Sequence, residues 1–491
     1  MTLDLTKGNP SKIILRFFMP VLLGNLFQQF YSIADIVIVG KFLGVQALAS
    51  VGSTGALSFL VIGFVIGVSS GFGIPVANFF GSGDMPAVRK CIFNILIASA
   101  ALTAVITVLT ASFTGALLEA MNTPEDIYEG AYTYIRIIFL YLGGIMLYNV
   151  LASIARAVGD SKTPLYFLIM SSVLNIGMDL LFIAAFKMGI AGAALATAFS
   201  QLISGILCLI YMYVNFKELR PRKENCALDM RLVRHLLYMG LPMALQFSIT
   251  AIGSVILQSA VNSFGSLAVA AITAGSKVQM MLAQPMEALG ASIAMYVSQN
   301  IGAKRLDRVR SGIKSSLFMA VSFSMVSCFI ANAWGRTISL LFISPDQVEI
   351  LLGVKQYLFA VSIFFWALGV LLLLRNAIQG LGYALPAMMA GVFELAARTL
   401  MAFISVRWFG FQAVVFSNSA AWIFACLILI PLYLKIMGKM KKRRIWVSEG
   451  QSNEQFSSFE SGVDPAEEQI EGRREIGYGE EQGEAIPTSE A

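Results

Sequence analysis

Two carboxylates lie within segments that are otherwise apolar. Asp35 falls in the apolar run 13–39, and Asp179 falls in the run 164–186. Asn175 precedes Asp179 by one helical turn, so on a helix the amide and the carboxyl would share a face. A charged side chain at the centre of a membrane helix costs about 2.5–3.5 kcal/mol on insertion scales, so each carboxylate needs a partner or a water-filled cavity.

Neutral polar groups are available to complete a site. Thr197 and Asn149 add a hydroxyl and an amide from two further apolar runs. Carboxylates with such neighbours can hold Na⁺ through oxygen ligands, or can take up a proton when one carboxyl is desolvated. The alternative is a buried structural hydrogen bond between the carboxyls. We predict a coupling-ion site, for Na⁺ or H⁺, formed by Asp35, Asn149, Asn175, Asp179 and Thr197.

The second half of the chain carries a different set of charges. Glu394 and Arg398 are one helical turn apart, and opposite charges at this spacing neutralise each other on one face, which predicts a structural pair. A carboxylate beside adaptable methionine surface suits varied lipophilic ligands, although lipid or core packing is the alternative. This interpretation assigns a possible substrate cavity to Gln284, Met286 and Glu287.

The elements that must position these groups are membrane helices. Of the 491 residues, 57% are hydrophobic and 13% are charged, against about 25% charged in an average soluble domain. About 20 apolar residues cross the hydrocarbon layer as a helix, which satisfies its backbone groups internally. Twelve such runs occur: 13–39, 47–80, 92–118, 131–155, 164–186, 190–216, 236–264, 267–300, 315–334, 356–374, 384–406 and 410–434.

The two halves of the chain repeat one another at a nearly constant offset. The matches include Met19-Pro20 with Leu241-Pro242, Gly44 with Gly265, Val158-Gly159 with Leu381-Gly382, and Gly189-Ile190 with Gly410-Phe411. Each half holds an even number of spans, so both run in the same direction. We predict an all-α membrane protein whose twelve transmembrane helices form two six-helix lobes, related by a pseudo-twofold axis normal to the membrane.

Charge sets the predicted orientation and boundaries. Lys and Arg concentrate in alternate connections, from Arg89-Lys90 to Arg375, which indicates that these connections and both termini are cytoplasmic. We expect a multi-pass protein of the cell (plasma or inner) membrane, with basic loops against anionic lipid and no nucleic-acid partner. The predicted parts are an N-terminal lobe, an interlobe linker, a C-terminal lobe and a basic, then acidic, disordered tail: 1–216, 217–235, 236–438 and 439–491.

Several kinds of site are excluded. The Gly-x-Gly stretches 71–73 and 81–83 lack the Lys-Ser/Thr of a phosphate loop, so no nucleotide is expected. The single histidine, His235, and five scattered cysteines offer no metal or disulfide framework. No cofactor is expected besides Na⁺ or H⁺ as the coupling ion. A monomer is the default.

Five stretches together resemble the multidrug and toxic compound extrusion (MATE) transporters, in particular the DinF-like branch. They are ADIVIVGKFLG at 34–44, RAVGDSKTP at 156–164, NIGMD at 175–179, GIAGAALAT at 189–197 and QNIGA at 299–303. The resemblance implies a secondary antiporter, not an enzyme, that expels small cationic or lipophilic compounds against entry of Na⁺ or H⁺ while two lobes rock around a central cavity. It also implies a first-lobe ion site at the residues named above, and a helix bend at Pro20.

Two other functions are weighed against this one. A flippase of lipid-linked precursors would share the helix layout but usually carries several basic residues in its cavity, where only Arg136, Lys277 and Arg398 could serve. A membrane-embedded prenyl or acyl transferase would need acidic metal-binding clusters or a histidine near its spans, and the sequence has neither.

Overall fold

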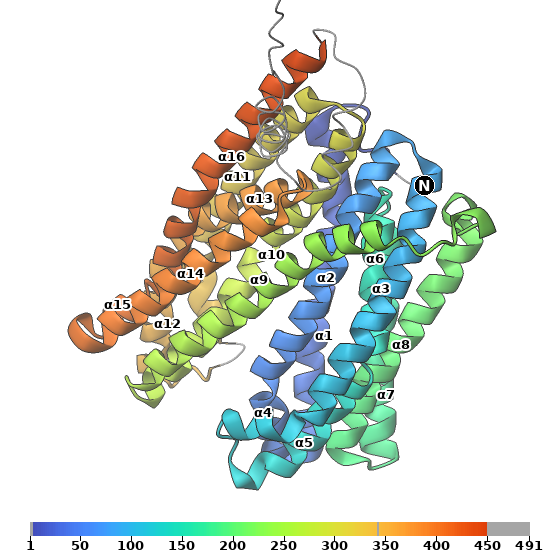
Figure 1. The fold of residues 1–491 in the computed structure, drawn as a ribbon. Helices are drawn as coiled ribbons and strands as arrows, with labels where there is room; N and C mark the ends of the chain where they lie inside the picture. The colour runs from blue at the N-terminus through green and yellow to red at the C-terminus, as the bar shows by residue number, and fades with distance from the viewer. Residues whose placement is uncertain (1–2, 341–342, 449–491) are drawn as a thin grey trace, which may run out of the picture. The chain divides into compact units, whose positions relative to one another are not determined.

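The computed structural model describes residues 3–340 and 343–448, with side chains described as far as Lys442. The chain forms two units, Met1–Tyr433 and Leu434–Ala491. In the described residues all regular structure is helical (Figure 1). This agrees with the predicted all-α class.

The first lobe comprises the helices before the interlobe linker. These are α1 (Pro10–Ser53), α2 (Gly55–Ser82), α3 (Met85–Ser112), α4 (Thr114–Ala120), α5 (Glu125–Leu140), α6 (Leu142–Ala157), α7 (Lys162–Asp179), the π-helix η1 (Leu180–Ala185) and α8 (Gly189–Asn215). Asn9 caps α1, because its side chain accepts hydrogen bonds from the Ser11 and Lys12 N–H groups while Pro10 occupies the first turn.

The second lobe begins after two short 3-10 turns, η2 (Lys217–Leu219) and η3 (Lys223–Asn225). Its helices are α9 (Met230–Asn262), α10 (Ser266–Gly302), α11 (Leu306–Ser339), α12 (Val348–Ser362), α13 (Phe365–Gly380), α14 (Ala384–Ile404), the π-helix η4 (Ser405–Phe409), α15 (Phe411–Val414) and the part of α16 (Ser417–Ser448) up to Tyr433.

The number of spans agrees with the prediction. Ten helices in the described part of the chain are long and apolar enough to cross a membrane. Two further spans are bent pairs, α5 with α6 at 48° and α12 with α13 at 51°. Counting each pair once gives twelve. Large exposed side chains such as Val108, Phe318 and Phe403 suit contact with lipid rather than water.

The backbone repeats between the lobes at the predicted landmarks. Positive φ angles occur in pairs at Gly44 (85°) and Gly265 (89°), at Gly159 (88°) and Gly382 (93°), and at Gly189 (62°) and Gly410 (68°). Such angles suit glycine because it lacks a β-carbon. Within the described residues, each lobe also has one bent span and one π-helix at the end of the following span. The internal repeat is therefore structural as well as sequential.

Glycines allow the two lobes to approach closely. α2 packs against α9 and α10, and α1 packs against α10 and α11. A β-carbon added at Gly67 would lie 2.6 Å from Ala244 Cα, and one added at Gly71 would lie 2.6 Å from Gly240 Cα. α2 and α9 therefore meet backbone to backbone.

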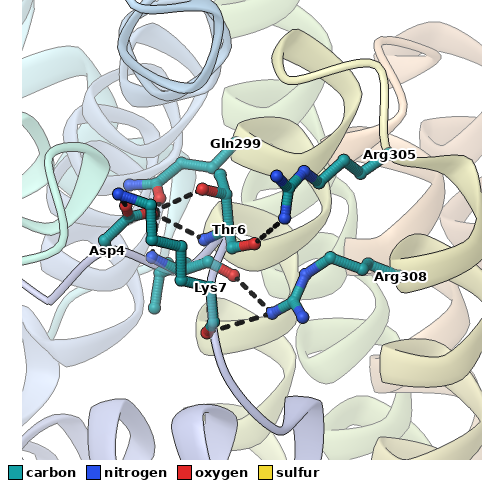
Figure 2. Close-up of polar contacts among 7 residues, drawn as sticks. Asp4, Thr6, Lys7, Gln299, Arg305 and Arg308 are labelled. Carbon is teal, nitrogen blue, oxygen red and sulfur yellow. Dashed lines mark hydrogen bonds and ion pairs between the residues drawn. The ribbon is translucent and has the colours of Figure 1, made fainter.

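The N-terminal segment 3–8 joins the lobes at one end of the helices. Figure 2 shows the side of this junction that involves Gln299, Arg305 and Arg308 of the second lobe. On the first lobe, Leu3 N–H donates to Gly159 O at 3.0 Å. On the second lobe, Leu5 N–H donates to Gln299 Oε1 at 3.2 Å, and Arg308 donates to Gly8 O at 2.6 Å and to Lys7 O at 3.2 Å. The segment therefore bridges the α6–α7 turn and the α10–α11 turn.

The linker is shorter than predicted, since α9 begins at Met230, inside the predicted range 217–235. Asp229 caps α9 and also pairs with Lys90 of α3 at 2.6 Å, which lets the helix begin early. α16 likewise continues as a helix into the predicted tail 439–491, and residues 449–491 lie outside the described residues.

Candidate functional site

Three helices of the first lobe bring four of the five predicted ion-site residues together. Asp35 comes from α1, Asn175 and Asp179 from α7, and Thr197 from α8; α1 packs against α5, α7 and α8. Asp179 is the last residue before the π-helix η1, a kind of irregularity that is frequent at functional sites. Asp179 is 0% exposed and Asp35 is 9% exposed. The site therefore lies inside the lobe.

The two carboxyl groups face each other. The side chains of Asp35 and Asp179 lie within hydrogen-bonding reach of one another. Asp35 Oδ1 and both carboxyl oxygens of Asp179 are buried without a hydrogen-bond donor, and so is Asn175 Oδ1. Two ionised carboxylates in such a place would repel each other, so the arrangement calls for a shared proton or a bound cation.

Neutral groups complete one side of the site. Asn175 Nδ2 donates to Thr197 Oγ1 at 3.4 Å, which leaves the Asn175 oxygen free to face a cation. The Tyr134 hydroxyl of α5 lies within hydrogen-bonding reach of Thr197. Thr197 therefore links Asn175 and Tyr134.

Tyr134 and Tyr31 were not among the predicted residues. Both hydroxyl groups lie close enough to Asp35 and Asp179 to interact with them electrostatically. Tyr31 precedes Asp35 by one turn of α1, so a helical-face argument on Asp35 would have found it. Tyr134 lies on α5, and its approach depends on tertiary packing that the sequence does not reveal.

Two other predicted residues have separate surroundings. Asn149 Nδ2 donates to Ile145 O of its own helix at 2.8 Å, and no described hydrogen bond joins it to the other four residues. Pro20 is buried inside α1, where only Gly44 has non-helical φ and ψ. A role for Asn149 and a bend at Pro20 stay predictions.

The predicted substrate residues on α10 have different environments. Met286 is 1% exposed and its sulfur accepts from the Ser324 hydroxyl at 3.5 Å, so it belongs to the core of the second lobe and not to a cavity surface. Gln284 is also buried and donates to Met280 O. Glu287 alone is exposed, although it lies in the middle of a membrane-spanning helix.

The ion pair at Glu394 differs from the one predicted. Arg375 Nη1 lies 3.1 Å from Glu394 Oε1, and the two side chains are only 11% and 8% exposed. Arg398 interacts with Glu394 electrostatically but does not form its ion pair in the described structure. Arg375 was predicted to mark a cytoplasmic connection; instead α13 continues past it to Gly380, because Glu394 compensates its buried charge.

These features define a class of protein: a multi-pass helical membrane protein of two repeated lobes, with a buried acidic pair in one of them. The sequence model of the MatE family matches residues 20–181 and 242–404. The chain belongs to the MatE family, and it is a membrane transporter for small molecules rather than an enzyme. The transferase alternative is therefore set aside.

Similar proteins agree with this assignment. The probable multidrug resistance protein YoeA of Bacillus subtilis (strain 168) is 29% identical over 70% of this chain and 76% of its own length. The probable multidrug resistance protein NorM of Thermotoga maritima is 24% identical over 89% of this chain and 95% of its own. A solved MATE transporter of the MOP superfamily, described as outward-facing, has a TM-score of 0.84 at 21% identity, and the match covers 90% of this chain and 99% of that one. The last likeness supports the two-lobe fold.

Proposed function

We propose that this transporter is a secondary antiporter that exports cationic or lipophilic organic compounds, drugs among them, in exchange for Na⁺ or H⁺. The observation that carries the proposal is the Asp35–Asp179 pair, whose buried oxygens have no hydrogen-bond donor. An uncompensated carboxylate in a low-dielectric interior is strongly unfavourable. A cation or a proton entering the pair removes that cost, so the charge of the first lobe depends on the coupling ion.

A change of charge inside one lobe can alter how the lobes fit together. The interlobe hydrogen bonds of the N-terminal segment and of Gln299 lie at one end of the helices, where Gln299 Nε2 donates to Ala157 O at 2.7 Å. Alternating access requires these contacts to break and contacts at the other end to form. A ligand can drive that exchange only through a difference in its affinity for the two states.

The substrate class rests on Glu287 and on the relatives. An exposed carboxylate on a membrane helix suits a cationic compound. Two curated relatives are named as multidrug resistance proteins. We further propose that the chain is a monomer in the cell membrane, surrounded by lipid, with both termini on the cytoplasmic side.

The proposed function is tested by reconstituting the purified protein into proteoliposomes and using ethidium as the substrate. Ethidium movement against its gradient is expected when an opposing Na⁺ gradient or pH gradient is imposed, and is not expected without either. The gradient that supports transport identifies the coupling ion. Equal transport with and without both gradients would contradict antiport.

A further inference from the structure

The first-lobe site has a counterpart in the second lobe. Each of these residues can be counted from the landmark that precedes it: the starts of α5 and α12, which are 223 residues apart, and the glycine pairs Gly159/Gly382 and Gly189/Gly410, which are 223 and 221 residues apart. By that count Tyr134 corresponds to Tyr357, Asn175 to Arg398, and Thr197 to Asn418.

One of the contacts among these positions is repeated, the one between the tyrosine and the residue at position 197 or 418. In the first lobe, Thr197 bonds with Asn175 and lies within reach of Tyr134. In the second, Asn418 Nδ2 donates to the Tyr357 hydroxyl at 3.2 Å, and Tyr357 interacts electrostatically with Arg398. In each lobe, three helices therefore bring side chains from corresponding positions together, and Arg398 of the second lobe stands where the first lobe has Asn175.

The acidic residues of the first lobe are missing at the corresponding positions. Counting from Pro20 and Pro242 places Leu257 at the position of Asp35, and counting from Gly159 and Gly382 places Ala402 at that of Asp179. The second lobe thus has apolar side chains in place of the carboxylates and a guanidinium in place of the amide.

A further change makes room for the guanidinium. Tyr31 corresponds to Gly253, at equal distance from the two prolines. A β-carbon added at Gly253 would lie 2.5 Å from Arg398 Nη1. Gly253 therefore leaves the space in which the head of Arg398 lies, whereas the first lobe has a tyrosine there.

The guanidinium is permanently charged and mostly enclosed. Arg398 is 6% exposed, and arginine does not lose its proton in proteins. Glu394 interacts electrostatically with both Arg398 and Arg375, and Glu287 interacts with Arg375. Arg375 and Glu394 form the ion pair of this group, at 3.1 Å. When all four side chains are ionised their charges sum to zero, so removal of Arg398 leaves one negative charge without compensation.

We propose that the Arg398 side chain is a tethered cation that fills, in the second lobe, the place taken by the exchangeable coupling ion in the first. The chain then exchanges cations at Asp35 and Asp179 alone, and the charge of the second lobe stays constant through the transport cycle. This inference rests on the proposed antiport, because it assigns the exchangeable site to one lobe.

The test is the number of cations bound by the purified full-length chain, measured with ²²Na⁺ and, in unbuffered solution, by proton uptake with a pH indicator. Cation binding should be lost in Asp179→Asn. Arg398→Asn gives the second lobe the amide that the first lobe has at the corresponding position, Asn175. It also leaves Arg375 as the only guanidinium that interacts with Glu287 and Glu394. It should therefore bind one additional cation per chain, also when combined with Asp179→Asn. Arg398→Lys keeps the charge and should not gain this cation.

Arg407→Asn makes the same change at an exposed arginine just beyond α14 and serves as the control. A folded Arg398→Asn chain with no additional cation would overturn the proposal. If Arg398→Asn does not fold, the Asp179→Asn variant provides the test. Cation binding that persists in Asp179→Asn, and is removed by a further Glu287→Gln or Glu394→Gln substitution, would place an exchangeable site in the second lobe and overturn the proposal. Failure of antiport itself appears separately, as a wild-type chain without cation binding at Asp179.

Discussion

Asp35 of α1 and Asp179 of α7 turn their carboxyl groups toward each other inside the first lobe, and three of their four oxygens have no hydrogen-bond donor. Asp179 is fully enclosed. We propose that a small cation or a proton neutralises this pair.

Thr197→Val should weaken the ion site without unfolding the lobe. Valine has nearly the same shape but lacks the hydroxyl that links Asn175 and Tyr134. A lost hydrogen bond of this kind is worth about 1 kcal/mol, so the apparent affinity for the coupling ion should fall about fivefold. The measurement is the ion concentration that gives half-maximal ethidium transport. Thr399→Val, at an exposed threonine on α14, is the control, and an unchanged affinity in Thr197→Val would remove Thr197 from the site.

Arg308→Ala should loosen the end of the molecule where the N-terminal segment binds. The guanidinium donates to the carbonyl groups of Leu5, Lys7 and Gly8 and to the Asn300 side chain. Hydrogen bonds from a charged donor contribute about 1.5–3 kcal/mol each in favourable cases, and the partial exposure of Arg308 reduces this, so a total loss of about 2 kcal/mol is expected. Thermal unfolding in detergent measures it.

The matched control for that experiment is Lys314→Ala, an exposed cation on the same helix. Protease access to the N-terminal segment reports its release directly. Equal unfolding temperatures and equal protease access in Arg308→Ala and wild type would contradict the role given to this arginine.

Gly67→Ala should destabilise the contact between the lobes. The added β-carbon would lie 2.6 Å from Ala244 Cα, and backbone atoms cannot move aside as a flexible side chain can. Overpacking of this kind costs about 1–3 kcal/mol. Gly52→Ala, where a β-carbon meets nothing within 4 Å, should be neutral or stabilising. Thermal unfolding compares the two variants. A similar melting temperature for both would contradict this prediction, because it would mean that α2 and α9 can move apart at little cost.

The Asp229–Lys90 pair should make stability depend on acid pH. The hydrogen bond from Lys90 lowers the pKa of the Asp229 carboxyl below its ordinary 3.8, and backbone N–H groups of Leu232 and Arg231 add to this. The folded chain therefore holds the Asp229 proton less tightly than the unfolded chain. The stabilisation is fully present above the ordinary pKa and is lost as pH falls through the lower folded value.

Asp229→Asn tests this, because asparagine can still cap α9 but carries no charge. Unfolding temperatures of wild type and variant should differ most near pH 6 and should converge as the pH falls below about 3. A difference that does not change with pH would show that the pair contributes through the cap alone.

Much of the fold could be predicted because membrane helices are long and the repeat is regular. The boundaries that failed are those where a charge is compensated within the fold. Arg375 ends an apolar run in the sequence, but in the structure it lies within α13 beside Glu394. Asp229 similarly allows α9 to begin before the predicted end of the linker.

The candidate site was predictable where residues share a helix and less so where they meet across helices. Asn175 and Asp179 follow from a four-residue spacing, whereas Tyr134 approaches them only through the packing of α5. Met286 looked like cavity surface because methionine is adaptable, but its face of α10 is turned into the core toward Ser324. Side-chain direction around a helix that is apolar on most sides is not fixed by periodicity alone.

The central claim is that Asp179 couples ion entry to export, and the most direct measurement is ion movement driven by substrate in proteoliposomes. An imposed ethidium gradient should drive opposing movement of ²²Na⁺ or H⁺ in the wild type. Asp179→Asn should abolish that ion movement while the protein still inserts and melts near the wild-type temperature. Ion movement in Asp179→Asn that equals the wild type would contradict the assignment of coupling to the Asp35–Asp179 pair.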